Sequence, residues 1–408
     1  MGVRGEMASR TSDKFDEEVL IGIDQLIMIR LAQQLGEAPD KVRNKVEGGG
    51  SVSNQRPIAE LAAHHFSEDI RRFVRSYAEV IPRQSFVVML ESCMAVGLTT
   101  ILNSVIELLL KWSETGKICK KGDQRPPPLF VDASNGTNPR LRGIAEQSFD
   151  DFLRCVERFP IILMGARLID WETRYNPRIR QQRIVTRPYA TEWLNLLGDV
   201  LSDRHEESQA ILYNLNLKTA ILAERLKEEA PETGALLEDA QGNPNPVWRM
   251  AEALTLLQGR GNAQVRLLGC LDSCLLTGRP NGLAAKRRVR QTGSITGNKT
   301  REIRSLVFTD TTLDYLVHLH LLHSGNRDGV RPLSYKEFLR LLRERYGFCV
   351  DEAPPGMTIS NDLLQVNRAI LERRLRDLGL LMGVNDAEAM KRLNPRFTPR
   401  EEETDAAD

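Results

Sequence analysis

The chain has 408 residues, which is enough for two or three domains that each have their own core. Its content of 41% hydrophobic and 27% charged residues is ordinary for a globular protein and excludes a disordered or fibrous class. The formal net charge is only +1, so any surface that attracts nucleic acid must be local.

The cysteines and the start of the chain indicate a cytoplasmic protein. The six cysteines are scattered and include no CxxC pair, which is typical of reduced thiols. The residues before Phe15 are polar and contain no apolar signal segment. In the most apolar stretch, 15 uncharged residues lie between Glu91 and Glu107, whereas a membrane span needs about 20. We therefore expect a buried core helix here and no membrane partner.

The first 125 residues read as a helical N-terminal domain. Helical periodicity predicts a helix over 15–35, followed by a linker around the glycine run at 48–50. A second helix is expected over 57–81, with a proline in its first turn. Pro82 then opens a long apolar helix that ends near Gly116.

Residues 126–278 are expected to form a central, mostly helical domain. Two short apolar runs, Leu129–Asp132 and 161–164, read as buried strands, with a helix over 141–158 between them. Helices follow over 189–230 and from Asn245 to about 276, in the second case as a helical hairpin.

A basic stretch follows at 279–304, where eight basic residues face a single acid, Glu302. Glycine, serine and threonine fill the gaps, which predicts a mobile, positively charged linker. Such a run is also typical of a solvated segment without any partner. Because basic arms commonly add phosphate contacts to DNA-binding modules, we predict contacts to nucleic acid by Lys286, Arg287, Arg288 and Arg290.

Residues 305–397 read as three helices and a return. Thr309 or Asp310 caps the first helix, Ser334 begins a capping box, and Gly379 ends the third helix. The third helix carries arginines and is followed by a hairpin-like segment, so the module resembles a winged helix. The loop over 347–359 is longer than the usual ~3–4 residues between its second and third helices. The remaining residues, 398–408, are expected to form a disordered acidic tail.

The winged-helix resemblance implies DNA contact through the third helix and the wing. On this helix we expect Arg368, Arg373 and Arg376 to bind nucleic acid. Winged helices also serve as protein-docking modules, and both roles remain open. The apolar arc of the helix should bury Leu364, Ile370, Leu371 and Leu378. Arg374 falls inside that arc, and the pattern does not explain it.

No catalytic residue, metal site or cofactor is predicted. The chain contains no phosphate-binding GxxxxGK[ST] loop and no strand-linked GxGxxG. His318, His320 and His323 cluster at spacings that do not complete a metal site. A metal-dependent nuclease would need Asp132 to meet Asp170 and Glu172, and nothing in their spacing requires this. We therefore predict that Asp132 is structural or inert.

The segments 130–134, 279–290 and 372–379 resemble accessory proteins of prokaryotic anti-phage defence operons. The resemblance implies work beside separate ATPase, nuclease or methyltransferase subunits. Taken together, the sequence predicts a mainly α, multi-domain protein with a helical body, few short strands and a C-terminal winged-helix-like domain. Its expected function is that of a non-enzymatic, DNA-associated adaptor or assembly subunit with DNA and protein partners. A purely structural scaffold and a divergent metal-dependent nuclease are the alternatives.

Overall fold

The computed structural model describes residues 44–45, 51–52, 56–186, 189–290, 300–322, 333–383 and 391–400. The chain divides into two compact units, Met1–Arg56 and Pro57–Asp408. In the first unit, β1 (Asn44–Lys45) and β2 (Ser51–Val52) form an antiparallel pair on either side of the glycine run that was expected to be a linker. The helix predicted over 15–35 lies outside the described residues.

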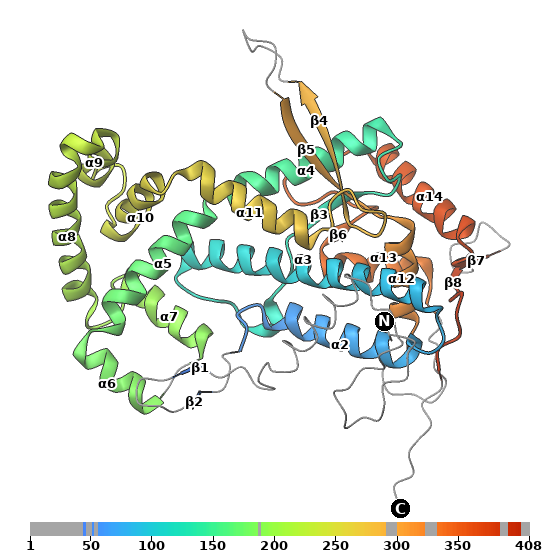
Figure 1. The fold of residues 1–408 in the computed structure, drawn as a ribbon, viewed down its shortest axis with the longest axis horizontal. Coiled ribbons are helices and arrows are strands. Elements are labelled where there is room, and N and C mark those ends of the chain that lie inside the picture. The colour runs from blue at the N-terminus through green and yellow to red at the C-terminus, as the bar shows by residue number, and fades with distance from the viewer. Residues whose placement is uncertain are drawn as a thin grey trace, which may run out of the picture. The chain divides into compact units, whose positions relative to one another are not determined.

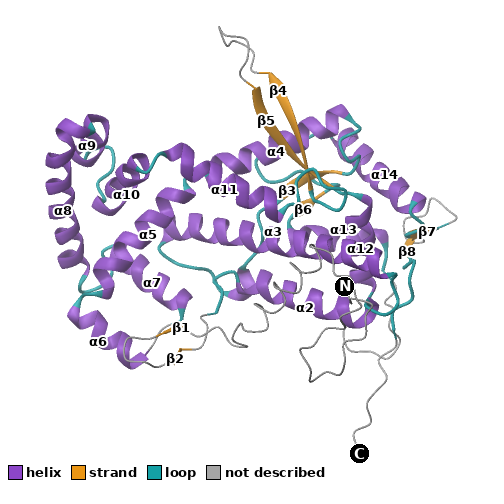
Figure 2. Cartoon of the chain, in the orientation of Figure 1, coloured by secondary structure: helices purple, strands orange, loops and turns teal. Residues whose placement is uncertain are grey.

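The second unit is mainly helical, as predicted, with only short strands among its helices (Figures 1 and 2). Its helices are α2 (Glu60–Tyr77), α3 (Arg83–Thr115), the short 3-10 helix η1 (Lys121–Asp123), α4 (Pro139–Val156), α5 (Phe159–Arg174), α6 (Pro177–Thr186), α7 (Ala190–Leu201), α8 (Ser208–Glu229), α9 (Pro231–Glu238), α10 (Pro246–Leu257), α11 (Arg260–Cys274), α12 (Asp310–Leu321), α13 (Tyr335–Tyr346) and α14 (Asn361–Asp377).

The long apolar helix α3 begins after Pro82 and ends at Gly116, as predicted from these two residues. Gly116 adopts a φ of 72°, the left-handed conformation that closes a helix. By length and composition α3 could cross a membrane, yet 61% of its most apolar window is buried inside the protein. It packs against α2, α5, α11 and α12. At Gly97 it lies so close to Phe66 of α2 that a Cβ atom would overlap the phenyl ring. This burial agrees with the expected core helix.

A four-stranded sheet in the order β4-β5-β3-β6 organises the other half of the unit. The central strand β3 (Leu129–Asp132) runs parallel to both β5 (Thr300–Val307) and β6 (Phe348–Cys349). β5 also pairs antiparallel with β4 (Ala284–Arg290). The sheet therefore joins three segments that are far apart in the sequence, and α4, which follows β3, packs along β3 and β5.

Two local predictions in this region differ from the structure. The strand predicted at 129–132 is β3, but the one predicted at 161–164 is wrong, because those residues belong to α5. Pro160 stands in the first turn of α5, and Phe159, Ile162 and Ile169 are buried at helical spacing. The predicted linker over 279–304 is also wrong, since it contains β4 and most of β5, and only 291–299 lie outside the described residues.

The C-terminal residues follow the predicted order of three helices and a return. Thr309 and Ser334 each accept a backbone hydrogen bond as the cap of α12 and α13. The long loop after α13 contains β6, a strand of the main sheet. After α14, β7 (Leu381–Met382) pairs antiparallel with β8 (Arg392–Leu393), and an isolated bridge joins Arg392 to Ser334.

The end of the described chain is held against the helical body. The ring of His318 is fully buried, and its Nε2 accepts hydrogen bonds from the backbone N–H groups of Arg396 and Phe397. The backbone N–H of Arg400 donates to the carbonyl of Ser76 in α2. The tail expected to be disordered from residue 398 onward is thus ordered at 398–400, and 401–408 lie outside the described residues.

Candidate nucleic-acid interface

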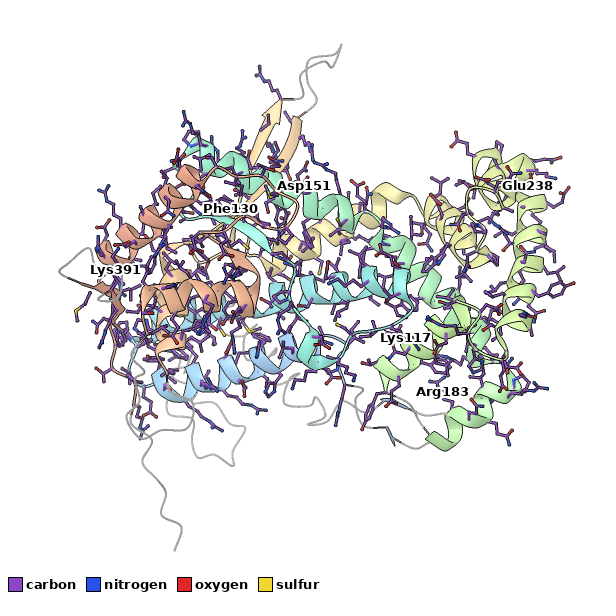
Figure 3. All side chains as sticks on the ribbon, turned by 180° about the vertical axis from the view of Figure 1, so that it is seen from behind. Lys117, Phe130, Asp151, Arg183, Glu238 and Lys391 are labelled. Carbon is purple, nitrogen blue, oxygen red and sulfur yellow. The ribbon has the colours of Figure 1, made fainter. Side chains whose placement is uncertain are left out.

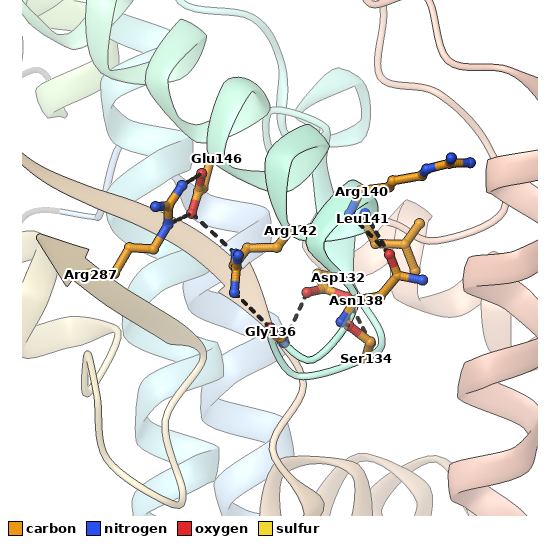
Figure 4. Close-up of polar contacts among 9 residues, drawn as sticks. All are labelled: Asp132, Ser134, Gly136, Asn138, Arg140, Leu141, Arg142, Glu146 and Arg287. Carbon is orange, nitrogen blue, oxygen red and sulfur yellow. Dashed lines mark hydrogen bonds and ion pairs between the residues drawn. The ribbon is translucent and has the colours of Figure 1, made fainter. Parts of the chain in front are cut away.

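The loop that leads from β3 into α4 positions the helix beside the candidate interface. Asp132, the last residue of β3, is fully buried, and its carboxylate accepts hydrogen bonds from the N–H and Oγ of Ser134 at 2.7 and 2.6 Å. It also accepts one from the N–H of Gly136 at 2.9 Å (Figure 4). The loop turns through positive φ at Asn135 (52°) and Gly136 (81°). These contacts agree with the structural role predicted for Asp132.

The same loop sets the start and the direction of α4. The side chain of Asn138 accepts hydrogen bonds from the N–H groups of Arg140 and Leu141, which are otherwise unpaired in the first turn. One turn further on, Arg142 donates to the carbonyl of Gly136. α4 therefore has a fixed register against the sheet, and its residue Glu146 points toward β4 (Figure 4).

One face of the β4–β5 hairpin is bound to α4 through ion pairs. Both oxygens of Glu146 accept hydrogen bonds from Arg287 of β4, with an Nη2–Oε2 distance of 2.6 Å. This hydrogen bonding raises the pKa of the Arg287 guanidinium further above its usual range. On β5, Arg301 pairs with one oxygen of Asp150 of α4. Each arginine on this face therefore has a carboxylate partner from α4.

The opposite face of the hairpin carries the remaining cations. Side chains alternate between the two faces of a strand, so Lys286, Arg288 and Arg290 share this face with their cross-strand partners Arg304, Glu302 and Thr300. Arg304 binds both oxygens of Asp272 at 2.7 Å. Burial alone would raise the pKa of Asp272, but the hydrogen bonds and charge of Arg304 outweigh it and lower that pKa.

Further out along this face, the carboxylate of Glu302 pairs with three cations, Lys286, Arg288 and Arg304. Glu302 lies 3.3 Å from the ammonium of Lys286 and 3.4 Å from Nε of Arg288. Hydrogen bonding to Lys286 is the main cause that lowers the pKa of Glu302. Arg290 is exposed and pairs with no acid among the described residues. This face therefore presents four cations against two carboxylates, Glu302 and Asp272, and keeps a net positive charge.

The predicted residues of α14 lie at three different depths. The side chain of Arg373 is 83% exposed and lies 3.8 Å from Asp377. Arg376 is exposed and pairs with Glu372. Arg368 is half-buried, with its guanidinium 5.8 Å from the centre of the Tyr335 ring. All three are placed by one helix, but the structure gives only Arg373 and Arg376 an exposed position.

The apolar face of α14 is largely as predicted. Leu364 and Leu371 are buried, whereas Ile370 and Leu378 are partly buried. The structure also accounts for Arg374, whose Nη1 donates to the carbonyls of Ala133 and Phe308 at 2.7 Å each, while its Nη2 pairs with Asp310. Arg374 therefore ties α14 to the ends of β3 and β5.

Sequence reasoning missed Asn367, which is fully buried on α14. Its Nδ2 donates to the carbonyls of Val131 and Val350, and its Oδ1 accepts from the N–H of Ala133, all at 2.9 Å. The only signal in the sequence is a polar residue between apolar positions of a helix. Asn367 thus binds backbone groups of β3 and of the loop after it, beyond the residues that pair with β6.

The carboxylates required for a nuclease do not come together. Asp170 accepts from Nε1 of Trp193 and pairs with Arg174, and Glu172 pairs with Lys218. Across the part of the chain that the structure describes, no group of three histidine, cysteine or acidic side chains could hold a metal ion. His318 and His320 have hydrogen-bond partners within the core, and His323 lies outside the described residues.

A groove of about 750 Å³ lies beside the hairpin and was not predicted. Phe149 and Leu153 of α4, Leu268 of α11 and Ile303 of β5 line it with apolar surface. The Arg301–Asp150 and Arg304–Asp272 pairs stand at its margin. The groove thus lies between α4 and α11, alongside β5.

The fold and these side chains define a mainly helical protein with a small mixed sheet and a basic hairpin. A family model described as "Methylation-associated defense system protein MAD7" matches residues 5–397. The chain therefore belongs to this family and is a component of a methylation-associated defence system. This agrees with the predicted resemblance to anti-phage defence proteins. No curated protein and no solved structure matched the chain in the same comparisons.

Proposed function

We propose that this protein is a non-enzymatic, DNA-associated subunit of its defence system, and that the β4–β5 hairpin is its main contact with DNA. The observation that carries the proposal is the division of charge between the two faces of the hairpin. The face toward α4 is neutralised by Glu146 and Asp150. The opposite face, which carries Lys286, Arg288 and Arg290, has more cations than carboxylates.

The geometry of a two-stranded ribbon suits this role. An antiparallel ribbon fits the major groove of duplex DNA, and strands serve as DNA-reading elements in several families. Figure 1 shows β4 and β5 extending past α4. Exposed ion pairs such as Arg288–Glu302 contribute little stability, roughly 0–1 kcal/mol, so a phosphate can replace the carboxylate at small cost. Sequence-independent phosphate contacts are the expected mode of binding.

A second contact through the C-terminal module is part of the same proposal. We propose that α12, α13 and α14, with β7, β8 and the bridge between Ser334 and Arg392, form a winged helix in which β6, a strand of the main sheet, is an added element between the second and third helices. In such a module α14 would be the recognition helix, with Arg373 and Arg376 toward the DNA. The neighbouring acids Glu372 and Asp377 weaken this site relative to the hairpin.

The test compares two double variants in binding to labelled duplexes of unrelated sequence, measured by fluorescence anisotropy over a range of salt. In Arg288→Ala with Arg290→Ala we expect weaker binding to every duplex. The log–log salt slope should flatten by about 0.9 for each lost phosphate contact. The control, Arg71→Ala with Arg75→Ala, removes the same charge from exposed positions on α2.

The control should leave both affinity and slope unchanged. An unchanged slope in the hairpin variant, or an equal loss in the α2 control, would overturn the assignment of the hairpin. If neither variant nor the wild type bound DNA at low salt, the protein would instead be a structural scaffold. Divalent-dependent cleavage of the duplex would reveal the nuclease alternative.

A further inference from the structure

Two helices remote from the hairpin in the sequence carry large apolar side chains on their surfaces. On α5, Trp171 and Tyr175 are more than half exposed, and their rings lie 4.8 Å apart. On α8, Tyr213, Leu217 and Ile221 are also more than half exposed and recur every four residues. Residues at this spacing share one face of a helix, so each helix has an uncovered apolar stripe.

The two stripes lie on the same side of the helical layer. Glu172 of α5 pairs with Lys218 of α8, and Asn176 at the end of α5 donates to Glu207 at the start of α8. The helices are therefore adjacent and antiparallel. Both also pack their buried faces against α10. The two helices meet at Glu172 and Lys218. Because they run antiparallel, the preceding residues, Trp171 and Leu217, lie on the same side of the helix pair, away from α10. Figure 3 labels Arg183 on α6 and Glu238 on α9, the helices that follow α5 and α8 in the chain.

We call these five residues, Trp171, Tyr175, Tyr213, Leu217 and Ile221, the α5–α8 patch. In two ion pairs beside the patch, the cation is exposed and the acid is mostly buried. The side chain of Arg178 is 76% exposed while that of its partner Glu207 is 10% exposed, and the values for Lys218 and Glu172 are 53% and 15%. Arg167, exposed on the same helix as Trp171, has no acidic partner among the described residues. A binding partner therefore meets apolar side chains with a positively charged rim on the α5 side, while the exposed Glu224, paired with Lys227, lies one turn beyond Ile221 on α8.

We infer that the α5–α8 patch is the docking site for an acidic amphipathic segment of another protein of the same defence system. Tryptophan, tyrosine and arginine are the residues most enriched at the energetic centres of protein interfaces. Leucine and isoleucine, which cannot stack on bases as aromatic rings do, favour a protein over a single nucleic-acid strand. The positive rim selects a partner whose apolar residues are flanked by aspartate or glutamate. This inference does not depend on DNA binding by the hairpin.

The experiment measures binding of the full chain to each of the other purified proteins of the system by biolayer interferometry. The variant Trp171→Ala with Leu217→Ala should lose at least tenfold in affinity for one of them. The matched control, Val265→Ala with Met382→Ala, truncates two equally exposed apolar residues elsewhere and should bind as the wild type does. Circular dichroism should show unchanged folding in both variants, because all four side chains are exposed.

A charge variant tests the stated chemistry of the partner. Arg167→Glu should weaken the same complex at low salt and lose that effect at high salt, whereas Arg71→Glu on α2 should not. The inference is overturned if no protein of the system binds the wild type, or if the double variant binds normally. Two other results would also overturn the inference. In the first, the double variant loses only self-association, measured by sedimentation. In the second, it loses only binding to a single-stranded oligonucleotide.

Discussion

Among the arginines of β4, neighbouring residues have opposite surroundings. Arg287 is bound to both oxygens of Glu146, whereas Arg288 is 76% exposed beside Glu302. In the sequence the two residues look alike, because four cations in a short run give no sign of which face each will occupy. The pairing gives Arg287 a structural role, since it holds β4 against α4. Arg288 and Arg290 remain the residues that the proposed DNA contact depends on.

A buried polar network at α2 and α13 makes His65 a source of pH dependence. Asp69 of α2 binds Arg345 and Tyr346 of α13, and His65 lies one turn before it. Burial, and next the positive charge of Arg345, lower the pKa of His65 from 6.5 to about 4, although Glu68 acts in the opposite direction. The folded state therefore favours the neutral imidazole.

We predict that the protein loses stability as the pH falls from 6.5 to about 4, because the unfolded chain takes up a proton on His65 that the folded chain refuses. After allowance for solvent screening, the loss from this group is about 1–2 kcal/mol. Urea denaturation at several pH values should show a flatter profile for His65→Gln than for the wild type. Identical profiles for the two proteins would contradict the prediction.

At the scale of elements, α14 is a core helix on one side and an exposed helix on the other. Leu371 and Leu375 are fully buried, Asn367 and Arg374 bind the ends of the parallel strands, and Arg373 faces solvent. The same helix therefore holds the sheet together on one side and is exposed on the other. Substitutions on its two sides should separate folding from binding.

We predict that Asn367→Ala lowers the free energy of unfolding by about 3–5 kcal/mol. The substitution leaves three buried backbone groups, at Val131, Ala133 and Val350, without a partner, and each unsatisfied group costs about 1–3 kcal/mol before the structure relaxes. The exposed control Gln365→Ala should stay within about 0.5 kcal/mol. Chemical denaturation measures both, and a loss below about 1 kcal/mol would show that Asn367 does not support the sheet.

At the scale of the whole molecule, the described C-terminal residues bind to both α12 and α2, which are far apart in the sequence. Arg396 and Phe397 donate to His318 in α12, Arg396 also pairs with Asp314, and Arg400 binds Ser76 in α2. The family match ends at residue 397, so it covers most of this contact. Residues 396–400 thus join α12 and α2 at the surface of the protein.

We predict that a chain ending at Asn394 is less stable than the full chain by about 2–4 kcal/mol, because the buried Nε2 of His318 loses both donors and Asp314 loses Arg396. A chain ending at Arg400 keeps every one of these contacts and should unfold at the same temperature as the full chain. Differential scanning fluorimetry compares the three. Equal melting temperatures for all of them would refute the role given to these residues.

The sequence by itself determined where several helices begin and end, because the signals are local, but it did not predict α5, α6 or α9. Pro82 and Gly116 bound α3, and Ser334 and Gly347 bound α13, through hydrogen bonds and φ angles that involve only a few neighbouring residues. The family membership agrees with a resemblance that the sequence already carried. Within α14, helical periodicity also placed Leu364 and Leu371 on the buried side.

Only the tertiary structure decided how the strands pair and which charges are neutralised. β3 lies between β5 and β6, whose paired residues are more than 170 positions away in the chain, and no local signal specifies such partners. The run at 279–304 looked like a linker because its polar and basic side chains gave no apolar alternation. It forms strands because β3, α4 and α11 supply the hydrogen bonds and carboxylates that the run itself lacks.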